Sequence, residues 1–276
     1  VKKLNKQYND TVVMRMGDGA SASVEVSSTG SIGLDIATGI GGYPRGKIVT
    51  IYGDPMSGKT TLALTAAREI QKAGGNILYV DVEHTLNLPY ASRIGVDVPN
   101  LWITQPDYGE QALRIVEEAV KSETFAMIII DSVAALAPKK EIEGEIGDAQ
   151  IGLLARLMSQ TCRKLLPGAH STNTTLMFIN QYRANISAMG YNTPTKTTPG
   201  GRALDYYSSL ILSIARTAYI RRDNEIIGAC TKVEIKKNKF APPYRSAEFD
   251  IIYGDGIDTL GEYVAIASSI GILSQS

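Results

Sequence analysis

The chain has 276 residues, of which 44% are hydrophobic and 20% charged, and its 28 basic side chains balance its 28 acidic ones. This composition is typical of one large α/β domain, and no apolar run approaches the length of a membrane span. The balanced charge argues against a protein that binds nucleic acid over its whole surface, so any such site must be local. Cys162 and Cys230 lie far apart without a metal-ligand spacing, which disfavours a disulfide scaffold and a zinc site. No signal peptide begins the sequence, so we expect a cytoplasmic protein without a membrane partner.

Apolar segments in chain order predict the fold. Polar residues 1–10 predict a short helix, because Leu4 and Tyr8 share one face, and residues 29–37 predict a turn that leads into a second short helix. Strands are predicted at 47–52, 76–81, 100–104, 126–131 and 174–180, with amphipathic helices between them. This alternation predicts an α/β fold with a mostly parallel sheet and helices on both faces. After Tyr207, shorter strands at 210–214, 231–236 and 246–252 are expected to add to one edge as antiparallel strands.

Two stretches match neither a helix nor a strand pattern. Residues 139–148 are dense in Glu and Gly, and residues 181–202 are dense in Asn, Thr, Pro and Gly. Because long irregular connections are uncommon in compact domains, the second stretch in particular is expected to be functional or disordered.

The segment between the first strand and its helix matches the phosphate-loop pattern GxxxxGK[ST]. The pattern comprises Gly53, Asp54, Pro55, Met56, Ser57, Gly58, Lys59 and Thr60, and Thr61 follows it. Strand, loop and helix stand in the order that lets backbone N–H groups and the helix N-terminus hold phosphates. The pattern predicts that Lys59 reaches the β- and γ-phosphates and that the Thr60 hydroxyl binds Mg²⁺. A turn that matches by chance is the disfavoured alternative.

Three polar residues end apolar strands, where ligands of such sheets bind. Asp131 is predicted to hold Mg²⁺ through water, although a helix cap is an alternative role. Glu83 is predicted to orient and deprotonate the attacking water, or it is only a solvated charge. Gln181 closes one strand and opens the second irregular stretch, so its amide can connect a γ-phosphate to that loop, although this signal alone is weak.

These residues stand within longer strings that resemble the bacterial RecA recombinase family from about Met14 to the end of the chain. The strings are 28–31, 51–53, 81–84, 105–107, 109–113, 131–136, 141–148, 158–160, 178–181 and 237–239. Ten strings in order exclude a chance match.

The resemblance implies a RecA-like P-loop ATPase core and a function. It implies an ATP-dependent homologous recombinase that forms a filament on single-stranded DNA, pairs it with a homologous duplex and exchanges strands in recombination and repair. The implied reaction is DNA-dependent hydrolysis of ATP with Mg²⁺. The alternative is a filament scaffold assembled by ATP, or a co-factor for repressor self-cleavage with weak hydrolysis. Ring-forming helicases and clock-type ATPases share the core but lack the strings 141–148 and 237–239.

The resemblance also implies individual roles around the nucleotide. Glu83 matches the family's water-activating glutamate, Gln181 its switch between the ATP and DNA sites, and Tyr90 a tyrosine that stacks on adenine. Lys237 and Lys239 match lysines that reach the ATP phosphates of a neighbouring subunit. Without the resemblance, these two lysines read as a solvated charge run or a basic patch.

The two irregular stretches resemble the family's DNA-binding loops, here at about 139–152 and 181–202. The residues expected to contact DNA are Ile151, Arg156, Ser159, Arg163, Arg183, Gly200, Gly201 and Arg202. Arg156 and Arg163 lie seven apart on one predicted helix face, where guanidinium groups can meet phosphates. Because the first loop is acidic, it is expected either to offer backbone N–H groups to DNA or to separate bases with an apolar residue such as Ile151.

Some positions depart from the family pattern. Asn87 stands where an aspartate usually lies near the adenine, so an altered nucleobase preference is expected. Asp205, Tyr206 and Ile211 occupy filament-interface positions that commonly carry Lys, Phe and Arg, so interface packing is expected to differ. Pro199 replaces a threonine and lacks the backbone N–H that could bind a phosphate. Arg202 is expected to restore this contact with phosphate.

The expected segments are a remnant of the N-terminal polymerisation segment at 1–20, the ATPase core at 21–257 and a truncated C-terminal region at 258–276.

Overall fold

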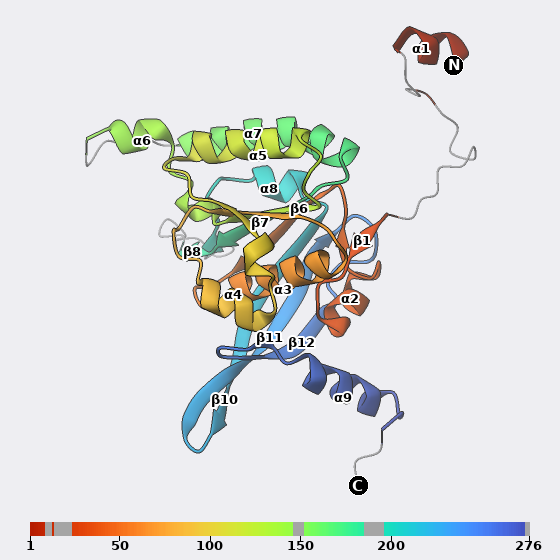
Figure 1. Ribbon diagram of the computed structural model, residues 1–276, viewed down its shortest axis with the longest axis vertical. Helices are drawn as coiled ribbons and strands as arrows, with labels where there is room; N and C mark the ends of the chain where they lie inside the picture. Colours follow the sequence, from red (N-terminus) through yellow and green to blue (C-terminus); the bar gives the residue numbers. More distant parts are fainter. Residues whose placement is uncertain (9–12, 14–23, 146–151, 185–195, 274–276) are drawn as a thin grey trace, which may run out of the picture.

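A nine-stranded sheet forms the centre of the described part of the chain (Figure 1). The computed structural model describes residues 1–8, 13, 24–145, 152–184 and 196–273. The strand order is β13-β12-β11-β10-β3-β7-β6-β4-β5. The strands are β3 (Ile48–Gly53), β4 (Ile77–Asp81), β5 (Trp102–Thr104), β6 (Met127–Asp131), β7 (Thr175–Gln181), β10 (Leu210–Arg222), β11 (Glu225–Asn238), β12 (Ser246–Ile252) and β13 (Gly256–Ile257).

The five predicted parallel strands are confirmed, whereas the prediction for the last part of the chain was wrong in two respects. Strand β10 pairs with β3 in parallel, so the expected antiparallel pairing begins only with β10–β11 and continues through β11–β12 and β12–β13. Strands β10 and β11 are also long, with 13 and 14 residues. Their distal parts extend beyond the sheet as a hairpin (Figure 1) and are exposed, so they lack the apolar pattern that reveals a strand.

Helices cover both faces of the sheet, as predicted. On one face, α3 (Lys59–Lys72) packs with Ile77, Tyr79 and Ile129 of the strands into one buried cluster. On the other face, α5 (Gly109–Lys121) and α7 (Leu153–Ser171) pack on Leu78 and Ile128. Neighbouring residues of one strand therefore serve opposite faces, and the strand interiors are mostly apolar.

The remaining elements are short. They are α1 (Lys2–Tyr8), β1 (Val26–Ser27), α2 (Ile32–Thr38), β2 (Tyr43–Pro44), α4 (Leu88–Ile94), a 3-10 turn (Val98–Asn100), a second 3-10 turn (Val133–Ala135), α6 (Lys139–Glu143), β8 (Arg183–Ala184), β9 (Lys196–Thr197), α8 (Ala203–Tyr207) and α9 (Thr259–Ser269). The helix predicted within 1–10 is confirmed at 2–8, and the turn into a short helix predicted at 29–37 is confirmed by α2. Within the described residues, no helix is both long enough and apolar enough to cross a bilayer.

The two stretches expected to be irregular contain some regular structure. Residues 139–143 form helix α6, where the sequence predicted no helix, and residues 146–151 lie outside the described part. Five residues are too few for a periodic signal, although a Lys139–Glu143 ion pair of 3.3 Å spans the turn. In the second stretch, β8 pairs with β9 in antiparallel fashion, and residues 185–195 lie outside the described part.

A buried carboxylate fastens α9 to α2. Glu262 is 7% exposed, and its Oε1 accepts hydrogen bonds from the Ser31 hydroxyl at 2.6 Å and from the Gly33 N–H at 2.9 Å. The Ser31 hydroxyl in turn accepts from the Leu34 N–H at the start of α2. One side chain near residue 260 thus stabilises a turn that precedes the phosphate loop by about twenty residues.

We predict that Glu262→Ala lowers the free energy of unfolding by about 1–3 kcal/mol, because two buried donors lose their acceptor. Urea denaturation of the whole chain measures this change. The control is Glu248→Ala, which removes an exposed carboxylate paired with Lys232 at 3.0 Å and should have a smaller effect. Equal losses in the two variants would contradict the fastening role.

Candidate functional site

The phosphate loop, Asp131, Glu83 and Gln181 meet where four neighbouring parallel strands end. Gly53 at the end of β3 pairs with Gln181 at the end of β7. Asp131 ends β6, which lies beside β7, and pairs with Asp81 at the end of β4. Glu83 follows β4 by two residues. The register therefore brings the loop, the two carboxylates and the glutamine to one edge of the sheet.

The loop between β3 and α3 has the backbone of an anion site. Gly58 has a φ of +97°, and a Cβ there would lie 2.5 Å from Ile251 Cδ1, so only glycine fits without strain. No side chain caps the N-terminus of α3. The Ser57 hydroxyl is buried, and none of the described residues bonds to it. A buried hydroxyl and an uncapped helix N-terminus suit a phosphate group.

The Lys59 ammonium bonds to backbone carbonyls of this loop and forms no ion pair with a described carboxylate. Its side chain is 7% exposed, and Nζ donates to the carbonyl oxygens of Gly53 at 3.1 Å and Asp54 at 2.7 Å. Burial lowers the pKa of Lys59, and the nearby carboxylates of Asp131 and Glu83 oppose that shift. An arriving phosphate would supply the anion that this buried ammonium lacks.

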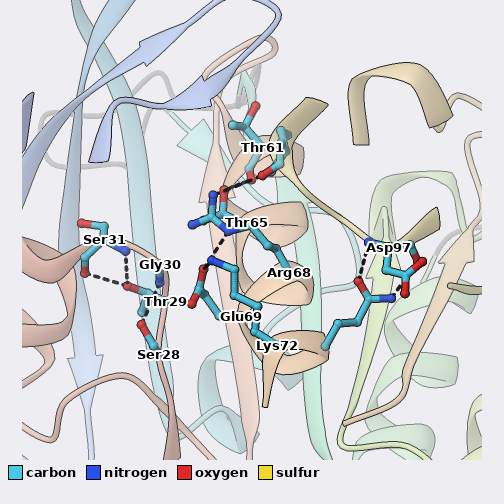
Figure 2. A network of polar contacts seen from close by, with 12 residues as sticks. Ser28, Thr29, Gly30, Ser31, Thr61, Thr65, Arg68, Glu69, Lys72 and Asp97 are labelled. Carbon is cyan, nitrogen blue, oxygen red and sulfur yellow. Dashed lines mark hydrogen bonds and ion pairs between the residues drawn. The ribbon is translucent and has the colours of Figure 1, made fainter. Parts of the chain in front are cut away.

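Polar contacts within α3 stabilise the helix that carries Lys59 (Figure 2). Thr65 Oγ1 donates to the carbonyl of Thr61 at 2.8 Å, and Arg68 pairs with Glu69 at 2.7 Å. The turn at 28–31 lies against this face, because a Cβ on Gly30 would come 2.3 Å from Thr65 Cγ2. The string 28–31 therefore has a packing reason as well as its resemblance to a family.

Asp131 faces the loop, and its role in holding Mg²⁺ through water stays a prediction. Its Oδ2 accepts from Thr60 Oγ1 at 2.9 Å and from the Tyr79 hydroxyl at 2.7 Å. Burial raises the pKa of the Asp131 carboxyl, and the two hydroxyl donors lower it. The alternative role as a helix cap is not supported, since Ser132 occupies the N-cap position of the following 3-10 turn.

Glu83 and Gln181 contact each other. Glu83 Oε1 accepts from Gln181 Nε2 at 3.0 Å and from the Ser132 hydroxyl. The carboxylate is half-buried, so it is not merely a solvated charge at a strand end. Asn180, one residue before Gln181, is fully buried and donates to the Pro199 carbonyl at 3.0 Å. The end of β7 therefore touches both the carboxylate and the far end of the second irregular stretch.

A cavity of about 270 Å³ adjoins the loop. Tyr90 lines it, and its hydroxyl hydrogen-bonds with Thr61 Oγ1 at 2.7 Å. Tyr253, which follows β12 much later in the chain, lines the cavity too. Asn87 is not among the lining residues; its side chain caps α4 by accepting from the Tyr90 N–H at 2.9 Å. An aspartate at this position would cap the helix equally well.

The structure does not bring Lys237 to the loop of its own chain. Lys237 pairs with Ile211, which pairs with Thr50 three residues before Gly53, so it lies toward the other end of the sheet. Its Nζ donates to the carbonyls at the end of α8, those of Asp205 at 2.6 Å and Tyr206 at 3.1 Å. Lys239 follows β11 and is exposed.

The candidate DNA contacts gather along α7 where the structure describes them. Arg156 and Arg163 are exposed, and Arg163 Nε donates to the Ser159 carbonyl at 3.2 Å. Gly200 and Gly201 have positive φ and pack on this helix, because a Cβ on Gly201 would lie 2.9 Å from Ala155 Cβ. These glycines therefore have a packing role that the sequence did not reveal.

Three other candidates are placed less fully. Arg202 lies over the Tyr206 ring, with 5.1 Å between Cζ and the ring centroid. The backbone of Arg183 belongs to β8, and its side chain is outside the described part. Ile151 lies outside the described residues altogether.

The positions that depart from the family pattern differ in exposure. Tyr206 is 62% exposed, whereas Ile211 is 6% exposed within β10. Asp205 is half-buried and accepts from the Tyr52 hydroxyl at 3.2 Å. Of the three, Ile211 packs inside its own chain and offers little surface to a neighbour.

Sequence analysis missed several residues that order the site. Asp81 accepts from the Thr85 and Leu86 N–H groups and from Gln105 Nε2, which fixes the loop that carries Glu83. Tyr79 and Ser132 donate to the two carboxylates. Their only sequence signal is a polar group within or just after a buried strand.

The phosphate loop, the carboxylate at the end of β6 and the sheet order define a P-loop nucleoside triphosphatase. The RecA N-terminal domain family matches residues 1–258. Protein RecA of Bacteroides thetaiotaomicron is 50% identical over 276 residues, which cover 100% of this chain and 83% of that protein. Protein RecA of Campylobacter hominis is also 50% identical over 276 residues, which cover 79% of that protein. The crystal structure of the RadB recombinase matches with a TM-score of 0.62 and 23% identity, over 84% of this chain and 98% of that chain, and supports the fold alone.

The chain therefore belongs to the RecA family. It is a homologous recombinase of DNA recombination and repair, with DNA-dependent ATPase and strand-exchange activities. Family membership also implies binding of ATP and single-stranded DNA and assembly into filaments.

We predict that Lys59→Ala abolishes ATP-dependent DNA binding, because no other buried cation lies in the described part of the loop. Filter binding of single-stranded DNA with and without ATP measures this effect. Lys72→Ala at the other end of α3 is the control. The Lys72 side chain is 62% exposed, and its ammonium pairs with Glu69 on the same helix. Undiminished ATP-dependent binding by Lys59→Ala would remove the loop from the mechanism.

Proposed function

We propose that the loop at 53–60 holds the ATP phosphates while the adenine occupies the adjoining cavity beside Tyr90. The buried Ser57 hydroxyl, the uncapped start of α3 and the Lys59 ammonium, which bonds to carbonyls and forms no ion pair with a described carboxylate, support the phosphate site. Gly53 to Thr61 form the wall nearest the phosphates. Asn87 acts indirectly, because it fixes the start of α4 and with it Tyr90.

The donor set beside the loop suits Mg²⁺. The Thr60 hydroxyl and the Asp131 carboxylate are hard oxygen donors 2.9 Å apart, which is the ligand chemistry that Mg²⁺ prefers. We assign direct ligation to Thr60 and a contact through water to Asp131. When bound, Mg²⁺ neutralises charge on the transferred phosphoryl group.

Glu83 is the proposed general base for hydrolysis. Its Oε1 is held by Ser132 and Gln181, whereas its Oε2 accepts no bond from any described residue. A water held by Oε2 can lose its proton to the carboxylate as its oxygen bonds to the γ-phosphorus. The bond from that phosphorus to the β,γ-bridging oxygen breaks, and ADP and phosphate are the products.

The observation that carries the coupling of hydrolysis to DNA is the pair of contacts at the end of β7. Gln181 touches Glu83, and Asn180 holds Pro199 at the end of the second loop. We propose that the Gln181 amide donates to the γ-phosphate when ATP is bound and returns to Glu83 afterwards. Because adjacent residues of one strand make the two contacts, that exchange changes the position of the loop.

The proposed DNA site follows α7 and the two loops. Arg156, Arg163 and the backbone at Gly200 and Gly201 would track phosphates without reading sequence. Ile151 would separate bases, and Arg183 and Arg202 would add phosphate contacts. Homology is then tested by base pairing with a duplex, not by protein contacts. Service as a co-factor for repressor self-cleavage is a second candidate that rests on the resemblance alone.

We further propose that Lys237 and Lys239 act on the ATP of the next subunit in a filament. Their distance from the loop of their own chain supports this role, since β11 returns them toward the opposite end of the sheet. Tyr206 would contribute exposed surface to the interface. The proposed segments remain 1–20 for polymerisation, 21–257 for the core and 258–276 for the start of a C-terminal region.

We predict that Glu83→Gln retains ATP binding and lowers turnover by about 10²–10⁴-fold, because an amide cannot accept the water proton. ATP hydrolysis should be measured with and without single-stranded DNA. Glu118→Gln is the matched control, since that carboxylate is 73% exposed on α5. Normal DNA-stimulated turnover in Glu83→Gln would exclude Glu83 as the base. In the unaltered chain, DNA binding without stimulated turnover would favour a filament scaffold.

A mixing experiment tests the role of the lysines across subunits. Lys59→Ala keeps both distal lysines, and the double variant Lys237→Ala/Lys239→Ala keeps its loop. Each variant alone should lack DNA-dependent hydrolysis. A mixture should regain activity at interfaces where the intact loop of the double variant meets the intact lysines of Lys59→Ala. Mixing Lys59→Ala with Glu83→Gln is the control, because both changes damage the part of the site that one chain supplies. No recovery in the first mixture would contradict action across subunits.

A further inference from the structure

The hydroxyl of Tyr79 is the one part of the carboxylate environment that the proposed reaction does not use. Tyr79 is 1% exposed, and its ring belongs to the apolar cluster between the sheet and α3. Tyr79 pairs with Ile129, which places it diagonally across from Asp131 on the same face of the sheet. The hydroxyl donates to Asp131 Oδ2 at 2.7 Å.

Two donors from different elements converge on that oxygen. Thr60 approaches from α3 at 2.9 Å, and Tyr79 approaches from β4. No described side chain bonds to Oδ1, which is therefore the oxygen that remains for a metal-bound water. A carboxylate with two fixed donors on one oxygen has lost the freedom to rotate about its Cβ–Cγ bond.

A structural explanation must be considered, since a buried tyrosine hydroxyl normally needs a partner. Tyr43 argues against that need in this fold. It is 0% exposed, and its hydroxyl has no partner among the described residues. Among the described residues, the fold therefore holds one buried tyrosine hydroxyl without a protein partner, so the need for a partner does not by itself account for the contact of Tyr79 with Asp131.

We propose that Tyr79 is a positioning residue that holds the Asp131 carboxylate in the orientation that receives Mg²⁺ with the nucleotide. This inference rests on the proposed metal role of Asp131. In the proposed site the Thr60 oxygen binds the metal, and the Thr60 hydroxyl proton is donated to Asp131. The position of this donor is therefore determined by the metal. Tyr79 is anchored by the core instead, and it fixes the carboxylate before the metal arrives. Pre-orientation of this kind strengthens binding without any new contact to the ligand.

The test is Tyr79→Phe in the whole chain, which removes one oxygen and keeps the ring that fills the core. Binding of a non-hydrolysable ATP analogue is measured by calorimetry over a range of Mg²⁺ concentrations and in EDTA. We expect the half-saturating Mg²⁺ concentration to rise about tenfold, the effect of one hydrogen bond to a charged group. Binding in EDTA should not change.

Two further variants make the result specific. Tyr43→Phe is the matched control and should leave the Mg²⁺ dependence unchanged. In an Asp131→Asn background, Tyr79→Phe should add little, because its effect passes through the carboxylate. A shift no larger than that of Tyr43→Phe, a full shift in the Asp131→Asn background or an equal loss in EDTA would each overturn the role of Tyr79. If Asp131→Asn alone leaves the Mg²⁺ dependence intact, the proposed metal role of Asp131 fails first.

Discussion

The site depends on the register of four adjacent parallel strands, β3, β7, β6 and β4. Their interiors are mostly apolar and buried on both faces, so the charged and amide side chains of the site stand where the strands end. Gly53 is level with Gln181, and Asp81 is level with Asp131. A slip of one residue in β6 would turn Asp131 to the opposite face of the sheet, away from Thr60 and Tyr79. Hydrogen bonding between strands therefore determines which functional groups meet.

The polar groups at this edge are satisfied in a way that leaves them available to a ligand. Asp131 and Glu83 accept from hydroxyl and amide groups, whereas Lys59 donates to backbone carbonyls. Had Lys59 paired with either carboxylate, the buried ion pair would have to break before a phosphate could bind, at considerable cost. A carbonyl is a weaker partner for an ammonium than a phosphate is. The arrangement therefore keeps the cation and the carboxylates separate from one another and available to the nucleotide and metal that we propose bind here.

Sequence patterns were sufficient for the fold class and for the residues at strand ends, because both follow from local periodicity. They failed where a feature depends on a distant segment. The hairpin of β10 and β11 extends beyond the core, so nothing buries one of its faces and no alternation marks it. The contact of Tyr79 with Asp131 and that of Asn180 with Pro199 join residues 52 and 19 positions apart. Gly201 was expected to serve DNA, yet its closeness to Ala155 is a packing constraint that no pattern encodes.

The direction of β11 explains why an ATP site would be divided between two copies of the chain. The loop lies at the carboxyl ends of the parallel strands, and the antiparallel return of β11 delivers Lys237 toward their other end. Within one copy, Lys237 cannot reach the phosphate loop unless β11 separates from β10. A head-to-tail interface, however, apposes unlike ends of successive copies, and such an interface generates a filament when its rotation does not close. The same topology that separates the lysines from the loop within a chain therefore makes assembly a condition for completing the proposed site.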